Sequence, residues 1–279
     1  MKTRLALLLF FGLLLSCGGD EQSNEPANAH DAKCDFESEI VLCRNSGQGI
    51  QNWIEEYGPL PEEMQYISLN RVENHEALEE LVGVKKAGAI FIRSADGAED
   101  LSFLSRLEEV GDLEIAGNKG LRSLEGLENL KTITFRLRIT GNGDLESLKG
   151  LENLERVGKV DEGEGLTIMS NPKLKNLEEI ESLEESFNLN IQSNNAMQTF
   201  GTLPSLELLG GMSIRFNDEL QDLGNAPNLR DIVKGMVIEK NKKFPDCEAE
   251  KFLAEVDDFD AAFTLEGNLP GSSCEDLGQ

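Results

Sequence analysis

One aliphatic position recurs along the chain at nearly constant spacing, and this repeat restricts the fold more than any other feature. The column comprises Leu69, Ile92, Ile115, Ile139, Ile168, Ile191, Ile214 and Ile238, at intervals of 23, 23, 24, 29, 23, 23 and 24 residues. A period of this length indicates a solenoid, in which each coil buries its apolar edge only against its neighbours.

Other positions repeat in phase with this column. Aliphatic residues also stand two places before it, so buried and outward positions alternate as in a short strand. Leucines recur six, nine and fifteen places after it. Three places after it, six consecutive coils carry asparagine: Asn118, Asn142, Asn171, Asn194, Asn217 and Asn241. An amide side chain both donates and accepts, so we predict that this asparagine ladder satisfies backbone groups at a buried corner.

The full unit, L-x-I-x-x-N-x-x-L-x-x-L-x-x-L-x-x-L, as in LEIAGNKGLRSLEGLENL (113–130), resembles receptor L-domain repeats. The resemblance implies a mainly β fold, a right-handed β-helix of about eight leucine-rich coils with small caps. An ordinary leucine-rich repeat places its next leucine two residues after the asparagine, whereas here it follows by three. The resemblance is weaker between Tyr66 and Val110, where Val72 and Ala95 take the asparagine positions.

The first residues have the parts of a secretory signal. Two basic residues precede an apolar run from Leu5 to Leu15, which is shorter than the ~20 apolar residues of a membrane-spanning helix. Leu14-Leu15-Ser16-Cys17 resembles the bacterial lipobox, which implies cleavage after residue 16 and lipidation of Cys17. An ordinary signal with a chance cysteine is the alternative. We expect a protein anchored by lipid to a bacterial cell envelope, on the outer membrane or cell surface rather than the inner membrane.

The remaining chain divides into four predicted segments. A polar, disordered tether spans residues 17–33, an N-terminal cap 34–60, the solenoid 61–256 and a C-terminal disulfide-bonded cap 257–279. Cys34, Cys43, Cys247 and Cys274 allow three pairings, and Cys34 with Cys43 and Cys247 with Cys274 is favoured over free thiols. We expect no cofactor and no metal, because no CxxC motif occurs and only His30 and His75 could complete a zinc site.

Charge and motifs exclude several functions. The chain has 26 Lys and Arg against 52 Asp and Glu, a net charge of −26, so its surface repels nucleic acid. No catalytic arrangement is credible, and we predict that the chain is not an enzyme. The insertion GKVDEGEG (158–165) offers Asp161, Glu162 and Glu164 to a cation, but it lacks the ligand spacing of a calcium loop. A plain surface insertion is favoured.

The outward strand positions form a candidate ligand face with few acidic residues apart from Asp112, Glu114 and Glu239. It comprises Phe91, Arg93, Arg136, Arg138, Met169, Asn190, Gln192 and Arg215. One hypothesis is a binding or adhesion module for an unknown protein or glycan. The alternative is a structural envelope protein whose polar strand face balances acidic surroundings without a discrete ligand.

Overall fold

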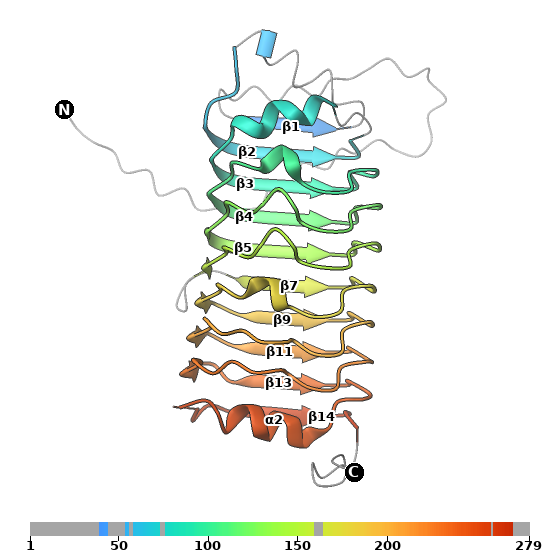
Figure 1. Cartoon of the computed structure of the whole chain (residues 1–279), viewed down its shortest axis with the longest axis vertical. Helices are drawn as coiled ribbons and strands as arrows, with labels where there is room; N and C mark the ends of the chain where they lie inside the picture. Colours follow the sequence, from blue (N-terminus) through green and yellow to red (C-terminus); the bar gives the residue numbers. More distant parts are fainter. Residues whose placement is uncertain are drawn as a thin grey trace, which may run out of the picture. The chain divides into compact units, whose positions relative to one another are not determined.

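Parallel strands lie one above another in a β-solenoid of about eight coils, as the repeat predicts (Figure 1). The computed structural model describes residues 39–43, 54–55, 58–72, 76–158, 164–257 and 259–269. The predicted signal peptide, the tether with Cys17, and Cys34 and Cys274 lie outside these residues.

The main sheet follows the order β1-β2-β3-β4-β5-β7-β9-β11-β13-β14. Its strands are β1 (Glu39–Cys43), β2 (Glu63–Asn70), β3 (Lys86–Arg93), β4 (Glu109–Ala116), β5 (Thr132–Thr140), β7 (Gly165–Met169), β9 (Leu189–Gln192), β11 (Met212–Arg215), β13 (Met236–Glu239) and β14 (Phe263–Glu266). Each member of the aliphatic column pairs in register with the next, as Ile168 does with Ile139 and Ile191. The whole column is buried. The repeat therefore fixes both the register and the inward face.

A second leg of each coil runs beside the main strands. Strands β2 to β5 are long, but β5 pairs with both β6 (Arg156–Val157) and β7, and later coils carry two short strands in place of one. The short ladder continues through β8 (Glu185–Ser186), β10 (Leu208–Leu209) and β12 (Asp231–Ile232). Helical turns η1 (Glu76–Gly83), η2 (Ser102–Leu104) and η3 (Glu178–Ile180) and helix α2 (Asp246–Leu253) occupy the return legs. The 29-residue interval falls where the long strand divides.

The asparagine ladder lies buried at the corner that follows the main strands. Each Oδ1 accepts the backbone N–H at the same position of the preceding coil, as Asn171 does from Asn142 at 3.0 Å. Each Nδ2 donates to the carbonyl of the aliphatic column one coil earlier, as Asn171 does to Ile139 at 3.0 Å. The ladder begins where the Ala95 N–H donates to Asn118 at 2.8 Å. The asparagine ladder therefore satisfies backbone groups at a buried corner, as the sequence predicts.

The residue before each ladder position has a left-handed backbone. Gly117, Gly141 and Gly267 supply it at no steric cost. The other coils use residues with a side chain: Arg71, Ser94, Ser170, Ser193, Phe216 and Lys240, all with φ between 51° and 59°. The corner is thus the same turn in every coil whose corner the structure describes, and most of these coils form it at some conformational cost.

The solenoid extends further at both ends than the sequence-based boundaries, 61 and 256, predicted. Strand β1 lies within the expected N-terminal cap and pairs with β2, with Leu42 opposite Leu69. Strand β14 lies within the expected C-terminal cap and pairs with β13. Asn268 then adds a seventh rung, since its Oδ1 accepts the Asn241 N–H at 3.0 Å and its Nδ2 donates to Ile238 and Asp246.

The last coil departs from the leucine pattern. Helix α2 follows the last strand of the repeat and turns Ala249 and Phe252 inward. Cys247 stands nine places after Ile238, where earlier coils bury a leucine or phenylalanine, but it is only half-buried because the helix replaces that part of the coil. Cys247 is disulfide-bonded. Its predicted pairing with Cys274 lies outside the described residues and stays a prediction.

Candidate ligand face on the main sheet

The strands present the predicted ligand face to solvent. In β9, β11 and β13 buried and half-buried residues alternate, and every member of the predicted face is half-buried. Cross-strand neighbours stand directly opposite in the parallel register, for example Asn190 between Thr167 and Ser213. Side chains from successive coils therefore form continuous rows across the strands.

At the N-terminal part of the face, Arg93 is held by its neighbours. Its Nε donates to Glu114 Oε1 at 2.6 Å, and its guanidinium stacks on the Phe91 ring, 4.7 Å from the centroid. The Tyr66 ring meets Phe91 edge-on with centroids 5.4 Å apart. Burial raises the pKa of Glu114, but the hydrogen bond and the charges of Arg93 and the nearby arginines outweigh it, so the pKa lies below its usual value.

In the middle of the face, Arg136 bridges three coils. It binds Asp112 through two parallel hydrogen bonds, Nε to Oδ1 at 3.0 Å and Nη2 to Oδ2 at 2.5 Å. Its Nη1 also donates to Glu164 Oε2 at 3.1 Å, and Arg138 approaches the same oxygen at 3.8 Å. The hydrogen bond to Asp112 holds the pKa of Arg136 above its usual value. This forked geometry makes Arg136 a link between coils.

The expectation of an arginine-rich face short of acids needs correction. Arg215 pairs with Glu239 at 2.9 Å, so each arginine of the face has a carboxylate from a neighbouring coil within 4 Å. The four arginines face four acids: Asp112, Glu114, Glu164 and Glu239. The face is therefore close to electrically neutral, and its cations are already engaged.

Beyond the ion pairs, the face over β7, β9 and β11 has almost no charge. Thr167, Met169, Asn190, Gln192 and Ser213 point outward there. Two of the coils have Gly165 and Gly211 at the position that Asp112 and Arg136 occupy in earlier coils. We call these five outward residues, with the two glycines, the uncharged patch. Its residues carry no charge, whereas the four arginines of the predicted face are all paired.

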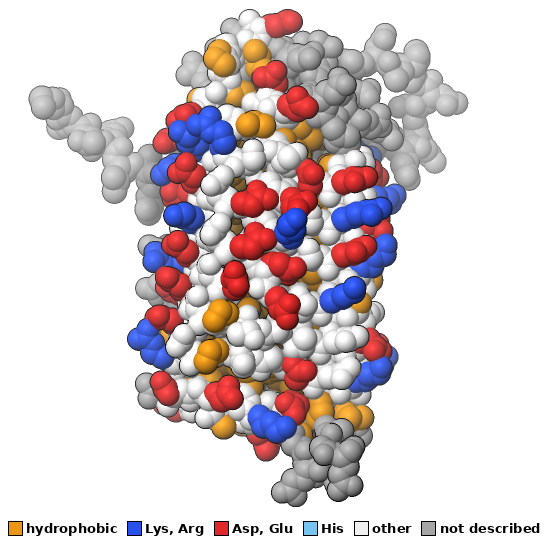
Figure 2. Space-filling model, viewed as in Figure 1, with side chains coloured by type: hydrophobic (Ala, Val, Ile, Leu, Met, Phe, Trp, Pro, Cys, Tyr) orange, Lys and Arg blue, Asp and Glu red, His pale blue; other side chains and the backbone are white. Residues whose placement is uncertain are grey.

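The excess negative charge is spread over other surfaces. Figure 2 shows acidic side chains over the upper and middle part of the viewed face, with lysine and arginine gathered along its edges. Cations there also pair across coils, as Lys173 does with Asp144 at 2.6 Å and Lys149 does with Glu125. Such exposed pairs contribute little individually, but they leave the carboxylate surplus to the solvent.

Metal chemistry finds no support in the described part of the chain. No group of three or more His, Cys, Asp and Glu there could hold a metal ion. Glu164 of the insertion binds Arg136 and Arg138, whereas Asp161, Glu162 and both histidines lie outside the described residues. Within the same described ranges, no helix is long and apolar enough to cross a membrane.

Comparisons with known proteins assign the chain to no group. No family model, no curated protein and no solved structure matches it. The functional argument therefore depends on the residues themselves.

Proposed function

We propose that this chain is an exported, lipid-anchored binding protein without catalytic activity, and that the uncharged patch is its contact surface for a protein or glycan of the envelope or its surroundings. The observation that carries the proposal is a flat, neutral strand face on a chain with a net charge of −26. A partner can approach such a face without desolvating unpaired charges. The resemblance to receptor L-domain repeats supports binding by analogy only.

The support for the lipid anchor is the signal-like N-terminal sequence that ends at Cys17. Acyl chains on Cys17 contribute ~0.8 kcal/mol per buried CH₂, which would hold the protein on a membrane through the tether 17–33. Fractionation of the source cells tests this part. The wild-type protein is expected with the membranes, and Cys17→Ala in the soluble fraction; a membrane-bound Cys17→Ala protein would contradict lipid anchoring.

The patch is tested by photo-crosslinking on intact cells. A benzoylphenylalanine at Asn190 lies in the centre of the patch, and one at Glu146, exposed on a return leg, is the matched control. Discrete adducts from position 190 that are absent from position 146 support the proposal. Equal patterns, or none from either position, would refute it. Charge reversal of Arg136 is unsuitable as a test of binding, because this residue links three coils.

A structural envelope protein is the second candidate, and one observation favours it. The arginines of the face are engaged in pairs between coils, as expected if they stabilise the stack rather than meet a ligand. Under this hypothesis, deletion of the protein alters envelope integrity, whereas Asn190→Arg, which leaves every pair intact, has no effect.

A further inference from the structure

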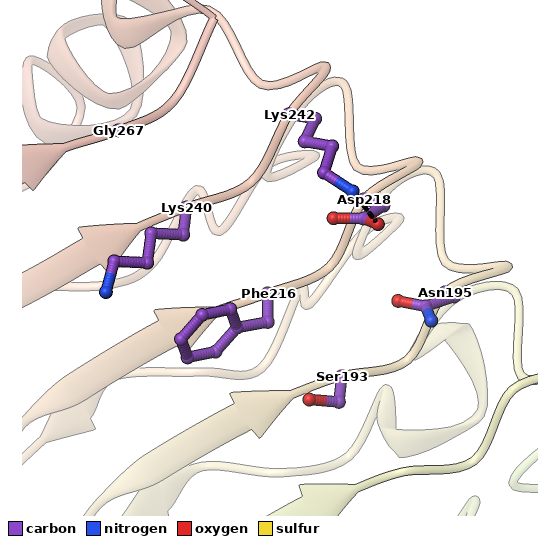
Figure 3. A pocket seen from close by; sticks show the side chains of 7 residues that line it. All are labelled: Ser193, Asn195, Phe216, Asp218, Lys240, Lys242 and Gly267. Atoms are coloured by element: carbon purple, nitrogen blue, oxygen red, sulfur yellow. Dashed lines mark hydrogen bonds and ion pairs between the residues drawn. The ribbon is translucent and has the colours of Figure 1, made fainter.

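A groove of about 500 Å³ follows the corner of the last coils (Figure 3). Two rows of side chains line it. One row contains the left-handed residues Ser193, Phe216 and Lys240, and the other contains Asn195 and Asp218, which directly follow the ladder asparagines. The buried ladder lies between these rows, so the groove has a rigid floor.

Phe216 is conformationally unusual. Its φ is 57°, a region in which a bulky residue is rare and strained, and its side chain is still 40% exposed. Other described coils place glycine, serine, lysine or arginine at this turn, as Gly117 and Gly141 show. Because the turn forms in the other described coils without an aromatic residue, the exposed part of the Phe216 ring points to a use outside the fold.

The surroundings of the ring are polar and open. Lys240 lies 5.2 Å from the ring centroid and forms no ion pair with a described residue. Ser193 lies on the other side of the ring, on the neighbouring coil (Figure 3). Within the described ranges, neither the Ser193 hydroxyl nor the Asn195 amide has a hydrogen-bond partner. Asp218 is held by Lys242 at 2.6 Å.

We propose that this corner groove is a saccharide site, in which a neutral hexopyranose packs its apolar face on Phe216 and its hydroxyls bind Ser193, Asn195 and Lys240. An exposed ring with convergent polar groups matches a ligand with one apolar face and a polar rim. The net charge of the chain, −26, disfavours anionic sugars at long range. Within the groove Asp218 is neutralised by Lys242, which leaves Lys240 to donate to a neutral hydroxyl. The site adjoins the uncharged patch but shares no residue with it, so its failure leaves the proposed function standing.

Saturation-transfer difference NMR on the purified soluble chain tests the site with four neutral trisaccharides: cellotriose, mannotriose, maltotriose and chitotriose. At least one is expected to bind the wild-type protein. Phe216→Gly should lower its affinity by about tenfold or more, as expected for the loss of a ring contact, whereas Phe216→Tyr should stay within about threefold. Lys240→Gln should weaken binding several-fold.

The same glycine variant separates binding from folding. Because glycine relieves the left-handed strain but gives up the buried part of the ring, Phe216→Gly should stay folded, with a melting temperature within about 5 °C of wild type. Phe135, exposed at a bulge of β5, provides the matched control, and Phe135→Gly should keep full affinity. The proposal is overturned if none of the four sugars binds, if Phe216→Gly binds like wild type, or if Phe135→Gly loses affinity equally.

Discussion

The asparagine ladder predicts a large, position-specific loss of stability when one rung is removed. In Asn171→Leu, the buried N–H of Asn142 loses its acceptor, which lies 3.0 Å away. An orphaned buried donor costs about 1–3 kcal/mol. The Nδ2 donations to Ile139 at 3.0 Å and Met169 at 3.2 Å also disappear, at about 0.5–1.5 kcal/mol each. The Met169 carbonyl still accepts from Gly141, so it is not left unpaired.

Leucine offsets part of this loss by burying more apolar surface, but its branched end must fit a column shaped for a planar amide. We expect a net loss of about 2–4 kcal/mol, which for a chain of this size lowers the melting temperature by roughly 5–15 °C. Thermal unfolding followed by circular dichroism measures it. Guanidinium titration of the same variant should show an earlier midpoint.

Asn153→Leu is the matched control for this prediction. Asn153 is an exposed asparagine whose Nδ2 also donates to a backbone carbonyl of the preceding coil, that of Glu128 at 2.8 Å. Water can replace that bond, so we expect a change within about 0.5 kcal/mol. If Asn171→Leu and Asn153→Leu shifted the melting temperature equally, burial of the ladder would have no special energetic role and the reasoning would be refuted.

Two further variants test coil spacing and acid sensitivity. In Gly150→Ala, the new Cβ would lie 2.0 Å from the Leu124 carbonyl oxygen, and the φ of 109° at this position is strained for alanine. Neighbouring coils must move apart to relieve the clash, so the free energy of unfolding should fall by about 1–3 kcal/mol, measured by thermal melting. Gly143→Ala meets nothing within 4 Å and should be neutral or slightly stabilising; an equal loss in both variants would contradict the clash. The pKa of Glu114 is lower in the folded chain than its unfolded value of about 4.5, so its pairing stabilises the fold above that pH and is lost as pH falls through the folded pKa. Glu114→Gln should therefore be destabilising at pH 7 and nearly neutral at about pH 3 in paired denaturant titrations, and a pH-independent difference would exclude this linkage.

The interior of the solenoid could be predicted from sequence because one-dimensional stacking makes register a direct consequence of the period. Ile115, Ile139 and Ile168 are spaced by 24 and 29 residues in the sequence. In the structure they pair directly across neighbouring strands, with no register shift at these positions. The extra residues were absorbed elsewhere, by the bulge between β4 and β5 and by the insertion before Gly165. Burial of the column leaves no other register open, since a slip of one residue would expose it.

The ends were harder to predict, although the sequence carried a signal for both. Ile40, Leu42 and Asn45 follow the spacing of the repeat, as do Phe263, Leu265 and Asn268. Both lie 27 residues from the neighbouring column member, outside the 23–24 period, and neither has the later leucines. Among the described strands, β1 and β14 each pair with a neighbour on one side only, so they do not require a full set of core leucines. A terminal coil can therefore lose most of the repeat and still pair.

The neutrality of the ligand face follows from the same register, and it shows where composition alone misleads. Arg136 stands directly opposite Asp112, and Arg215 directly opposite Glu239, so both pairs could be read from the period. Asp112, Glu114 and Glu239 are visible in the sequence as acids of the face, but a count of residue types does not show that each lies beside an arginine of a neighbouring coil. In a solenoid, the closest outward neighbours of a side chain lie one period away in the sequence. The charge of a surface must therefore be counted over the residues that stand at the same position in successive coils, and not over residues that are adjacent along the chain. By that measure the strand face is neutral and the acidic excess lies on other surfaces. Under the proposed binding role, contact specificity would come from the uncharged patch and the corner groove.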